Sequence, residues 1–190
     1  MRVLLVHGIM DTGAKFRRLQ PFLEARGHRC LAPSLTPRDG RDGLLPMARQ
    51  LSREIDRAWG REATFAIVGF SMGGLIARLY LQQLGGAARV DRFFAVSVPH
   101  RGSLLAYGMW GRGAREMRPG SALLKALDAT VQGLEGLRLR AYWTPFDAVI
   151  VPPRNCIWPA AENRRVLALC HPCMLWHRTV LADIAEGIED

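Results

Sequence analysis

Short apolar runs alternate with longer amphipathic stretches along most of this chain. An apolar run of about four to eight residues, bounded by glycine, proline or polar residues, is typical of a buried strand. Such runs predict six strands, at residues 3–6, 28–32, 64–69, 92–98, 137–143 and 165–169.

The stretches between these strands carry the spacing of helices that pack on one side. Residues 44–59 are the clearest case, because apolar side chains recur every three or four positions with arginines on the opposite side. Residues 16–23 have helical spacing that Pro21 interrupts, and Gly27 is placed to end that segment. Further helices are predicted at residues 72–84, 122–129 and 174–186.

Strands that alternate with helices predict an α/β fold with a parallel sheet covered by helices on both faces. A chain of 190 residues suits a single domain, and no internal repeat or linker divides residues 1–190. The segment 104–136 fits no simple repeat, and we expect a small lid or cap insertion there, or a loop with one helix. In parallel sheets the chemistry gathers beyond the carboxyl ends of the strands, so residues that follow each strand are candidates for a functional site.

The segment Gly69-Phe70-Ser71-Met72-Gly73 joins the third predicted strand to a predicted helix. Gly-x-Ser-x-Gly in this position is the nucleophile-elbow pattern, in which a tight turn exposes the serine hydroxyl. Glycine is needed on both sides of the serine because a Cβ there would collide with neighbouring backbone. We therefore predict Ser71 as a catalytic nucleophile. A glycine-rich turn without catalytic function is the alternative.

A catalytic serine needs a base, and the base needs a carboxylate that orients it. With this elbow the expected chain order is serine, acid, histidine. Asp147 follows the fifth predicted strand and His171 the sixth, so we predict Asp147 as the acid and His171 as the base. His177 is a second candidate for the base, although its register in the last predicted helix favours packing on the sheet. A turn-forming role is the alternative for Asp147.

Two backbone N–H groups are expected to stabilise the oxyanion of the tetrahedral intermediate. One belongs to Met72, directly after the nucleophile, and the other to Ile9 in the loop after the first strand. His7, His100 and Trp110 are candidates for lining the substrate pocket. No metal or organic cofactor is implied, because serine, imidazole and amide groups suffice for this chemistry.

Charge adds little to this picture. The formal net charge is +9 and nearly all positive residues are arginines, but they are scattered and no nucleic-acid motif appears. We therefore expect a solvated basic surface, no nucleic-acid partner and at most weak association with a membrane surface. The N-terminal apolar run is too short for a signal peptide and no stretch approaches a membrane span, so we expect a soluble, cytoplasmic protein.

The four cysteines are interpreted from the expected location of the protein. Without an export signal, Cys30, Cys156, Cys170 and Cys173 are expected to be free thiols. The last two form a C-x-x-C pattern, for which a redox pair or half of a zinc site is the less favoured alternative, since a second C-x-x-C is missing.

Several of these segments resemble the α/β-hydrolases, specifically the small bacterial lipases and esterases. Val6-His7-Gly8-Ile9 resembles their oxyanion loop, and Gly69-Phe70-Ser71-Met72-Gly73-Gly74 their nucleophile elbow. Val98-Pro99-His100-Arg101-Gly102-Ser103 is similar to the Thr-Pro-His-x-Gly-Ser run of many lipases, with Val98 in place of threonine. Thr144-Pro145-Phe146-Asp147 resembles the acid loop, and Cys170-His171-Pro172-Cys173-Met174-Leu175 the loop that carries the base.

This resemblance covers nearly the whole chain and implies the same triad of Ser71, Asp147 and His171. It also implies a minimal α/β-hydrolase fold, with a six-stranded, mostly parallel sheet in the strand order 2-1-3-4-5-6, because the first two strands of larger hydrolases are absent. The segment 104–136 is too short for a full cap domain.

The expected activity is hydrolysis of small-molecule carboxylic esters through an acyl-enzyme on Ser71. A thioesterase or acyltransferase that uses the same triad is one alternative, because the sequence does not distinguish water from another acceptor. A catalytically silent hydrolase fold that serves as a binding module, on membrane surfaces for example, is the other.

Overall fold

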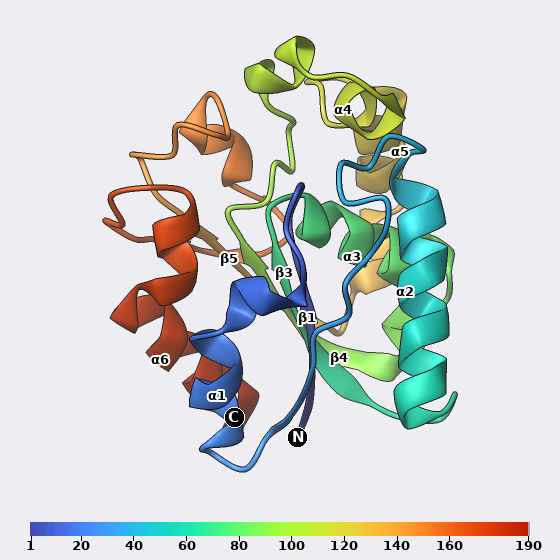
Figure 1. The fold of residues 1–190 in the computed structure, drawn as a ribbon, viewed down its shortest axis with the longest axis vertical. Coiled ribbons are helices and arrows are strands. Elements are labelled where there is room, and N and C mark those ends of the chain that lie inside the picture. The colour runs from blue at the N-terminus through green and yellow to red at the C-terminus, as the bar shows by residue number, and fades with distance from the viewer. Residues whose placement is uncertain (190) are drawn as a thin grey trace.

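A computed structural model describes residues 1–189 and has a six-stranded parallel sheet at its centre (Figure 1). The strands are β1 (Arg2–Val6), β2 (Arg29–Leu31), β3 (Phe65–Phe70), β4 (Val90–Val96), β5 (Arg138–Trp143) and β6 (Glu162–Arg165). They lie in the order β2-β1-β3-β4-β5-β6, and every neighbouring pair is parallel. The predicted fold class and strand order are confirmed, and the sheet is parallel throughout.

Helices cover both faces of this sheet (Figure 1). On one face lie α2 (Leu44–Trp59) and α3 (Met72–Gln83), and on the other α1 (Leu19–Glu24) and α6 (Arg178–Glu189). Each face has its own apolar cluster, because the strands are buried on both sides. The predicted amphipathic helix at 44–59 is confirmed with the same bounds, and its apolar stripe is buried against α3.

The segment 104–136 folds into short helical pieces that begin beyond the carboxyl end of β4 and then pack along α3 (Figure 1). These are the 3-10 turn η3 (Leu104–Gly108), α4 (Arg112–Glu116), α5 (Ala122–Ala129) and the 3-10 turn η4 (Val131–Leu134). The predicted helix at 122–129 is confirmed as α5, where Ser121 caps the N-terminus by accepting from the Leu124 N–H. A lid function for this segment stays a prediction. The remaining 3-10 turns are η1 (Gly13–Phe16), η2 (Gly86–Arg89), η5 (Pro153–Cys156) and η6 (Pro172–Trp176).

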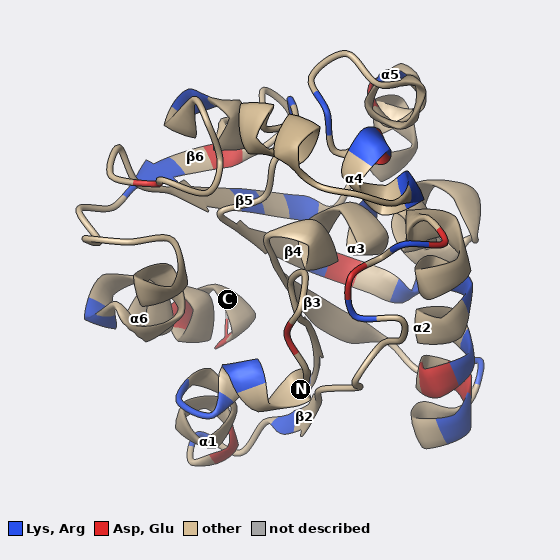
Figure 2. Ribbon diagram, turned by 45° about the horizontal axis from the view of Figure 1, so that its top comes forward, with Lys and Arg blue, Asp and Glu red and all other residues tan. Residues whose placement is uncertain are grey.

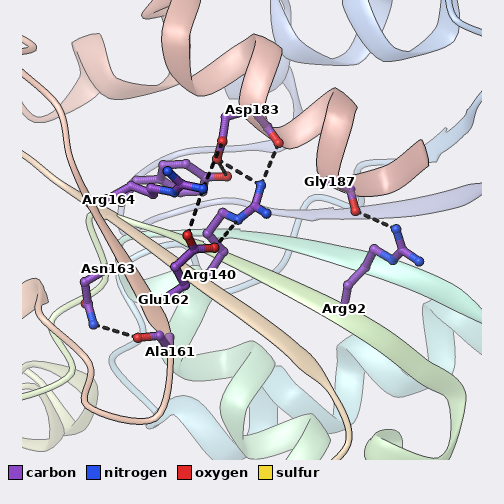
Figure 3. Close-up of polar contacts among 9 residues, drawn as sticks. Arg92, Arg140, Ala161, Glu162, Asn163, Arg164, Asp183 and Gly187 are labelled. Carbon is purple, nitrogen blue, oxygen red and sulfur yellow. Dashed lines mark hydrogen bonds and ion pairs between the residues drawn. The ribbon is translucent and has the colours of Figure 1, made fainter. Parts of the chain in front are cut away.

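Arginines of the sheet fix the last helix in place (Figure 3). Arg140 on β5 donates to the Asp183 carbonyl at 3.0 Å and to its carboxylate at 3.1 Å, and Arg92 on β4 donates to the Gly187 carbonyl. Tyr142 also donates to the Asp183 carboxylate. Because charged groups at a partly buried interface are stable only when paired, these contacts hold α6 in one position behind the loop that carries His171.

The sixth strand differs from the prediction. It comprises Glu162–Arg165 rather than residues 165–169, and Arg140 of β5 pairs with Glu162 across the two strands at 3.1 Å. Val166 and Ala168 point into the core while Leu167 and Leu169 are exposed. This alternation has the period of a strand, but residues 166–169 are a loop whose remaining link to β5 is the hydrogen bond from the Val166 N–H to the Trp143 carbonyl, at 2.8 Å.

Two helix predictions also need correction. Pro21 does not interrupt α1, because it lies in the first turn, where its missing N–H would have no partner. The last helix begins at Arg178 rather than residue 174, since residues 172–176 form the 3-10 turn η6. His177 therefore lies between η6 and α6 and not inside the helix.

Candidate active site

Ser71 lies in the sharp turn between β3 and α3. Its φ is 53° and its ψ −127°, a conformation that costs energy for residues with a side chain and that clusters at functional sites. A Cβ on Gly73 would lie 2.2 Å from the Val6 carbonyl oxygen, and one on Gly69 would lie 2.7 Å from the backbone of α3. The Ser71 N–H donates to the Val96 carbonyl at 2.9 Å, which fixes the turn against β4. The segment thus has the geometry that the elbow pattern predicts.

Asp147 and His171 form a buried pair. The Asp147 Oδ2 lies 2.7 Å from His171 Nδ1, and the two side chains are 0% and 7% exposed. Asp147 Oδ1 accepts from the N–H groups of Val149 and Ile150, at 2.9 and 2.8 Å. Burial opposes ionisation of Asp147, but the hydrogen bonds from His171 and from these two N–H groups together hold its pKa below the usual range. An ionised Asp147 keeps the His171 proton on Nδ1 and leaves Nε2 free to accept a proton.

Side-chain hydrogen bonds hold the loops that carry this pair. Thr144 Oγ1 donates to the Ala168 carbonyl at 2.6 Å and so joins the Asp147 loop to the His171 loop. Ser103 Oγ donates to the Val149 carbonyl at 2.8 Å and accepts from the Val151 N–H at 3.0 Å. The sequence alone does not predict this role for Ser103, although Ser103 ends the Pro-His-x-Gly-Ser run.

His171 packs beside the elbow without a direct hydrogen bond to the serine. The ring of Phe70, the residue before Ser71, lies 4.8 Å from the His171 ring. Among residues 1–189 the hydrogen bond of the His171 side chain runs to Asp147, and none joins it to Ser71 Oγ. In structures without substrate such bonds are often long or poorly aligned and tighten only when substrate binds. The three residues predicted as a triad therefore lie at the same edge of the sheet, and Asp147 and His171 are in direct contact.

The backbone N–H groups of Ile9 and Met72 are the predicted oxyanion donors. In the described part of the chain neither group donates to a protein acceptor. Met72 is the first residue of α3, where N–H groups lack a partner within the helix. Next to Ile9, Met10 has a φ of 60° and its N–H donates to the Arg38 carbonyl at 2.8 Å, which fixes the loop. Both donors are free to bind an anionic oxygen, and this role stays a prediction.

A small apolar cavity of about 70 Å³ lies beside Ser71. Segment 104–136 contributes Leu105, Ala106, Met109 and Met117 to its wall. Every side chain that lines it in the described structure is uncharged. A larger cavity of about 570 Å³ lies next to Trp143 and Arg165 and does not include Ser71. Of these two cavities, the one at Ser71 is therefore the candidate for binding a reacting group.

The three residues proposed to line this cavity lie elsewhere. His7 Nε2 accepts from the Leu35 N–H and its Nδ1 donates to the Gly8 carbonyl, both at 2.8 Å, so both ring nitrogens serve the fold. His100 stacks on Trp158 at 4.5 Å and lines a separate cavity. Trp110 is 94% exposed. These placements correct the predicted pocket lining, since two of the side chains are used in packing and the third is solvated.

Exposed apolar side chains surround the sheet edge that carries Ser71. We call them the apolar rim: Met10, Leu104, Leu105, Tyr107, Trp110, Phe146, Val149, Leu167 and Leu169. They belong to the loops that follow β1, β4, β5 and β6, and Leu105 and Val149 also line the cavity. Lysine and arginine, in contrast, are spread over many elements (Figure 2). The entrance to the candidate site is thus apolar and open to solvent.

Cys170 and Cys173 form a disulfide, with a Cα–Cα distance of 5.0 Å. Cys30 and Cys156 are free. The expectation of four free thiols is therefore wrong for the C-x-x-C pair, because the turn at η6 brings the two cysteines within the distance that a disulfide needs. Within residues 1–189, His, Cys, Asp and Glu side chains form no group of three that could hold a metal ion. The helices described there are also too short or too polar to cross a membrane.

Comparisons with known proteins agree with this fold. A family model described as alpha/beta hydrolase fold matches residues 2–128, which include the elbow but end before Asp147. No curated protein matches the chain in sequence.

Solved structures show the same fold at low sequence identity. The mature form of the Bacillus licheniformis lipase BlEst2 is 15% identical, with a TM-score of 0.81 over 98% of this chain and 91% of that one. Aspergillus fumigatus lipase B is 14% identical, with a TM-score of 0.80 over 100% of this chain and 52% of that one. Polyneuridine aldehyde esterase is 16% identical, with a TM-score of 0.70 over 100% and 99% of the two chains. At these identities the likeness shows the fold and not the activity.

Proposed function

This chain belongs to the alpha/beta hydrolase fold family, and on that premise we propose that it is a serine hydrolase that cleaves carboxylic esters. The observation that carries the proposal is the buried Asp147–His171 pair, which lies beside a serine in the elbow conformation. A buried acid–base pair next to a potential nucleophile is the arrangement that activates a hydroxyl group. The family neighbours described as lipases and esterases support the same reaction class.

The proposed mechanism uses groups of this chain alone. His171 Nε2 takes the proton of the Ser71 hydroxyl as Oγ attacks the acyl carbon, and Asp147 stabilises the imidazolium that forms. The N–H groups of Ile9 and Met72 donate to the oxyanion. Collapse of the tetrahedral intermediate expels the alcohol, which receives the proton from His171 and leaves an acyl group on Ser71. Water, activated by the same imidazole, then releases the acid.

The same acyl-enzyme could pass its acyl group to another acceptor, or form from a thioester. Product analysis in the presence of alcohol or thiol acceptors separates these reactions from hydrolysis. Weak association of the protein with a membrane surface stays a prediction.

Replacing Ser71 by alanine is expected to abolish ester turnover, with a loss on the order of 10⁴-fold or more, because the attacking atom is removed. The measurement is turnover of an activated short-chain ester, together with intact-mass analysis after treatment with a fluorophosphonate. Wild type should gain one adduct, and Ser71→Ala should gain none.

The matched control is Ser52→Ala, a change on α2 away from the site, which should label and turn over like wild type. Wild-type rates in Ser71→Ala would rule out the proposed nucleophile. Absence of an adduct on folded wild type would favour the alternative of a catalytically silent hydrolase fold that serves as a binding module.

Short acyl chains are expected to be the preferred substrates. The cavity of about 70 Å³ is less than half the roughly 150 Å³ of an engineered cavity that accepts benzene, so it holds an acyl chain of about two to four carbons. Since one poorly accommodated methylene is worth about 1–3 kcal/mol, kcat/KM should fall at least about 10-fold from a butyryl to a decanoyl ester.

The test is a series of p-nitrophenyl esters of increasing chain length. Met117→Ala enlarges the cavity and should raise the relative rate with long chains, whereas Trp110→Ser, at a position outside the cavity, should leave the profile unchanged. A wild-type profile that rises with chain length would contradict the cavity as the acyl site.

A further inference from the structure

The Cys170–Cys173 disulfide encloses the residue assigned as the base. The bridge spans three positions of the chain, and the residues between the two cysteines are His171 and Pro172. Both cysteines are partly exposed, so a thiol in solution can reach the pair. The side chain of His171 itself is buried against Asp147 and Phe70. A partly exposed disulfide bond therefore lies within one or two residues of the group on which the proposed reaction depends.

The backbone on the two sides of His171 is anchored unequally. After it, Met174 and Leu175 are buried in the core, and the Met174 N–H donates to the His171 carbonyl at 3.3 Å. Before it, Leu169 is 84% exposed, and the chain is next held at Ala168, whose carbonyl accepts from Thr144.

Between these anchors Cys170 has few restraints. Its carbonyl and its Sγ accept from the Cys173 N–H, at 3.1 and 3.2 Å, and among the residues described no other hydrogen bond holds Leu169 or Cys170. The disulfide is therefore the main restraint on the chain that enters His171.

The other two cysteines are poorly suited to thiol–disulfide exchange. Burial, with a smaller contribution from Glu24, raises the pKa of the Cys30 thiol to about 12. Burial, followed by the charge of Asp147, raises the pKa of the Cys156 thiol well above its ordinary value. Since the thiolate is the reactive form, neither competes with Cys170 and Cys173 at ordinary pH.

We propose that the Cys170–Cys173 disulfide is a redox switch that positions His171 for catalysis, an inference that rests on the proposed hydrolase function. The oxidised pair holds the backbone that enters His171, and with it the contact to Asp147 and the orientation of Nε2 toward Ser71. Opening the bond frees this backbone, so the productive orientation is occupied for a smaller fraction of the time. Cys170 and Cys173 are positioning residues, because they act through His171.

The step requires a dithiol as reductant. One thiolate of the dithiol attacks a cysteine sulfur, breaks the S–S bond and forms a mixed disulfide, while the other cysteine sulfur leaves as a thiolate. The second thiol of the reductant then displaces the first cysteine. Two electrons and two protons pass to the protein, which ends with two thiols, and the reductant ends as a cyclic disulfide. In a reducing compartment the pair would be held open, and in an oxidising one it would be closed.

The experiment compares kcat and KM for a butyryl ester before and after treatment of the whole protein with dithiothreitol, and again after reoxidation with oxidised glutathione. Alkylation followed by mass analysis counts the free thiols in each state, and complete fluorophosphonate labelling of Ser71 normalises kcat to active sites. Reduction should lower kcat about 10-fold with KM little changed, because small misplacements of a catalytic group are costly, and reoxidation should restore it. Equal or higher kcat in the reduced state would overturn the switch.

The variants separate positioning from a general loss of structure. The double variant Cys170→Ser/Cys173→Ser should have the kcat of reduced wild type and no response to dithiothreitol, while Cys30→Ser should respond like wild type. A double variant with the kcat of oxidised wild type would also overturn the switch, and far-UV circular dichroism verifies that it is folded. Ester turnover that is the same in both redox states would contradict the redox switch and would leave the proposed function supported. Absence of turnover and of Ser71 labelling in both states removes both.

Discussion

Replacing Asp147 by asparagine is expected to lower kcat by on the order of 10⁴-fold while the protein stays folded. The asparagine side chain can still accept from the N–H groups of Val149 and Ile150, so the loop keeps its hydrogen bonds. Its amide N–H would then face His171 Nδ1, which forces the His171 proton onto Nε2. A histidine in that tautomer cannot take the proton of Ser71. Steady-state kinetics on a short acyl ester at neutral pH measures the loss.

The control for this variant is Asp91→Asn. Asp91 lies on β4 with its side chain 49% exposed, pairs with Arg92 at 2.9 Å and does not line the cavity beside Ser71. It should retain wild-type kcat. Activity of Asp147→Asn within about 10-fold of wild type would show that Asp147 is not the acid of a triad, since orienting carboxylates carry much larger effects.

The lowered pKa of Asp147 determines how its contribution to stability depends on pH. A carboxyl group whose pKa is lower in the folded than in the unfolded state contributes stability above its unfolded pKa of about 3.9 and loses it as pH falls through the folded value. Asp147 is therefore charged throughout the neutral range. A loss of activity on mild acidification must come from another group.

The sequence predicts the parts of the fold whose signal is local. The helix at 44–59 has a long periodic stripe, and the elbow needs glycine at fixed positions, so both are recovered with nearly the observed bounds. The sixth strand is misplaced because alternation at residues 166–169 has the period of a strand although the chain has already left the sheet. Which residues form the edge strand depends on the contacts between β5 and β6, and a local sequence pattern does not contain that information.

The candidate site also has one part that the sequence predicts and another part that it does not. Ser71, Asp147 and His171 can be predicted from the sequence because each comes after a strand of a parallel sheet, where side chains converge at one edge. The wall of the cavity could not be predicted from the sequence, because Met109 and Met117 lie in a segment without a simple repeat. The disulfide around His171 could not be predicted either, since a C-x-x-C pattern does not by itself fix the distance between the two sulfur atoms.

Gly73→Ala is expected to destabilise the protein by about 3 kcal/mol or more, or to prevent folding. A Cβ at this position would lie 2.2 Å from the Val6 carbonyl oxygen and 2.4 Å from that of His7. Both are backbone atoms, at the last residue of β1 and at the residue after it, so no change of side-chain rotamer relieves the contact, and either α3 or the sheet must move. Urea unfolding followed by circular dichroism measures the loss.

Gly133→Ala is the matched control for this effect. Gly133 also lies in a helical segment, but a Cβ there would meet no atom within 4 Å, so the free energy of unfolding should change by less than about 1 kcal/mol. Equal stability of the two variants would show that the elbow is not closely packed against β1. Because Gly73 lies two residues after Ser71 in the same turn, a Gly73→Ala protein that folds but has lost turnover would place the effect in the geometry of the turn rather than in global stability.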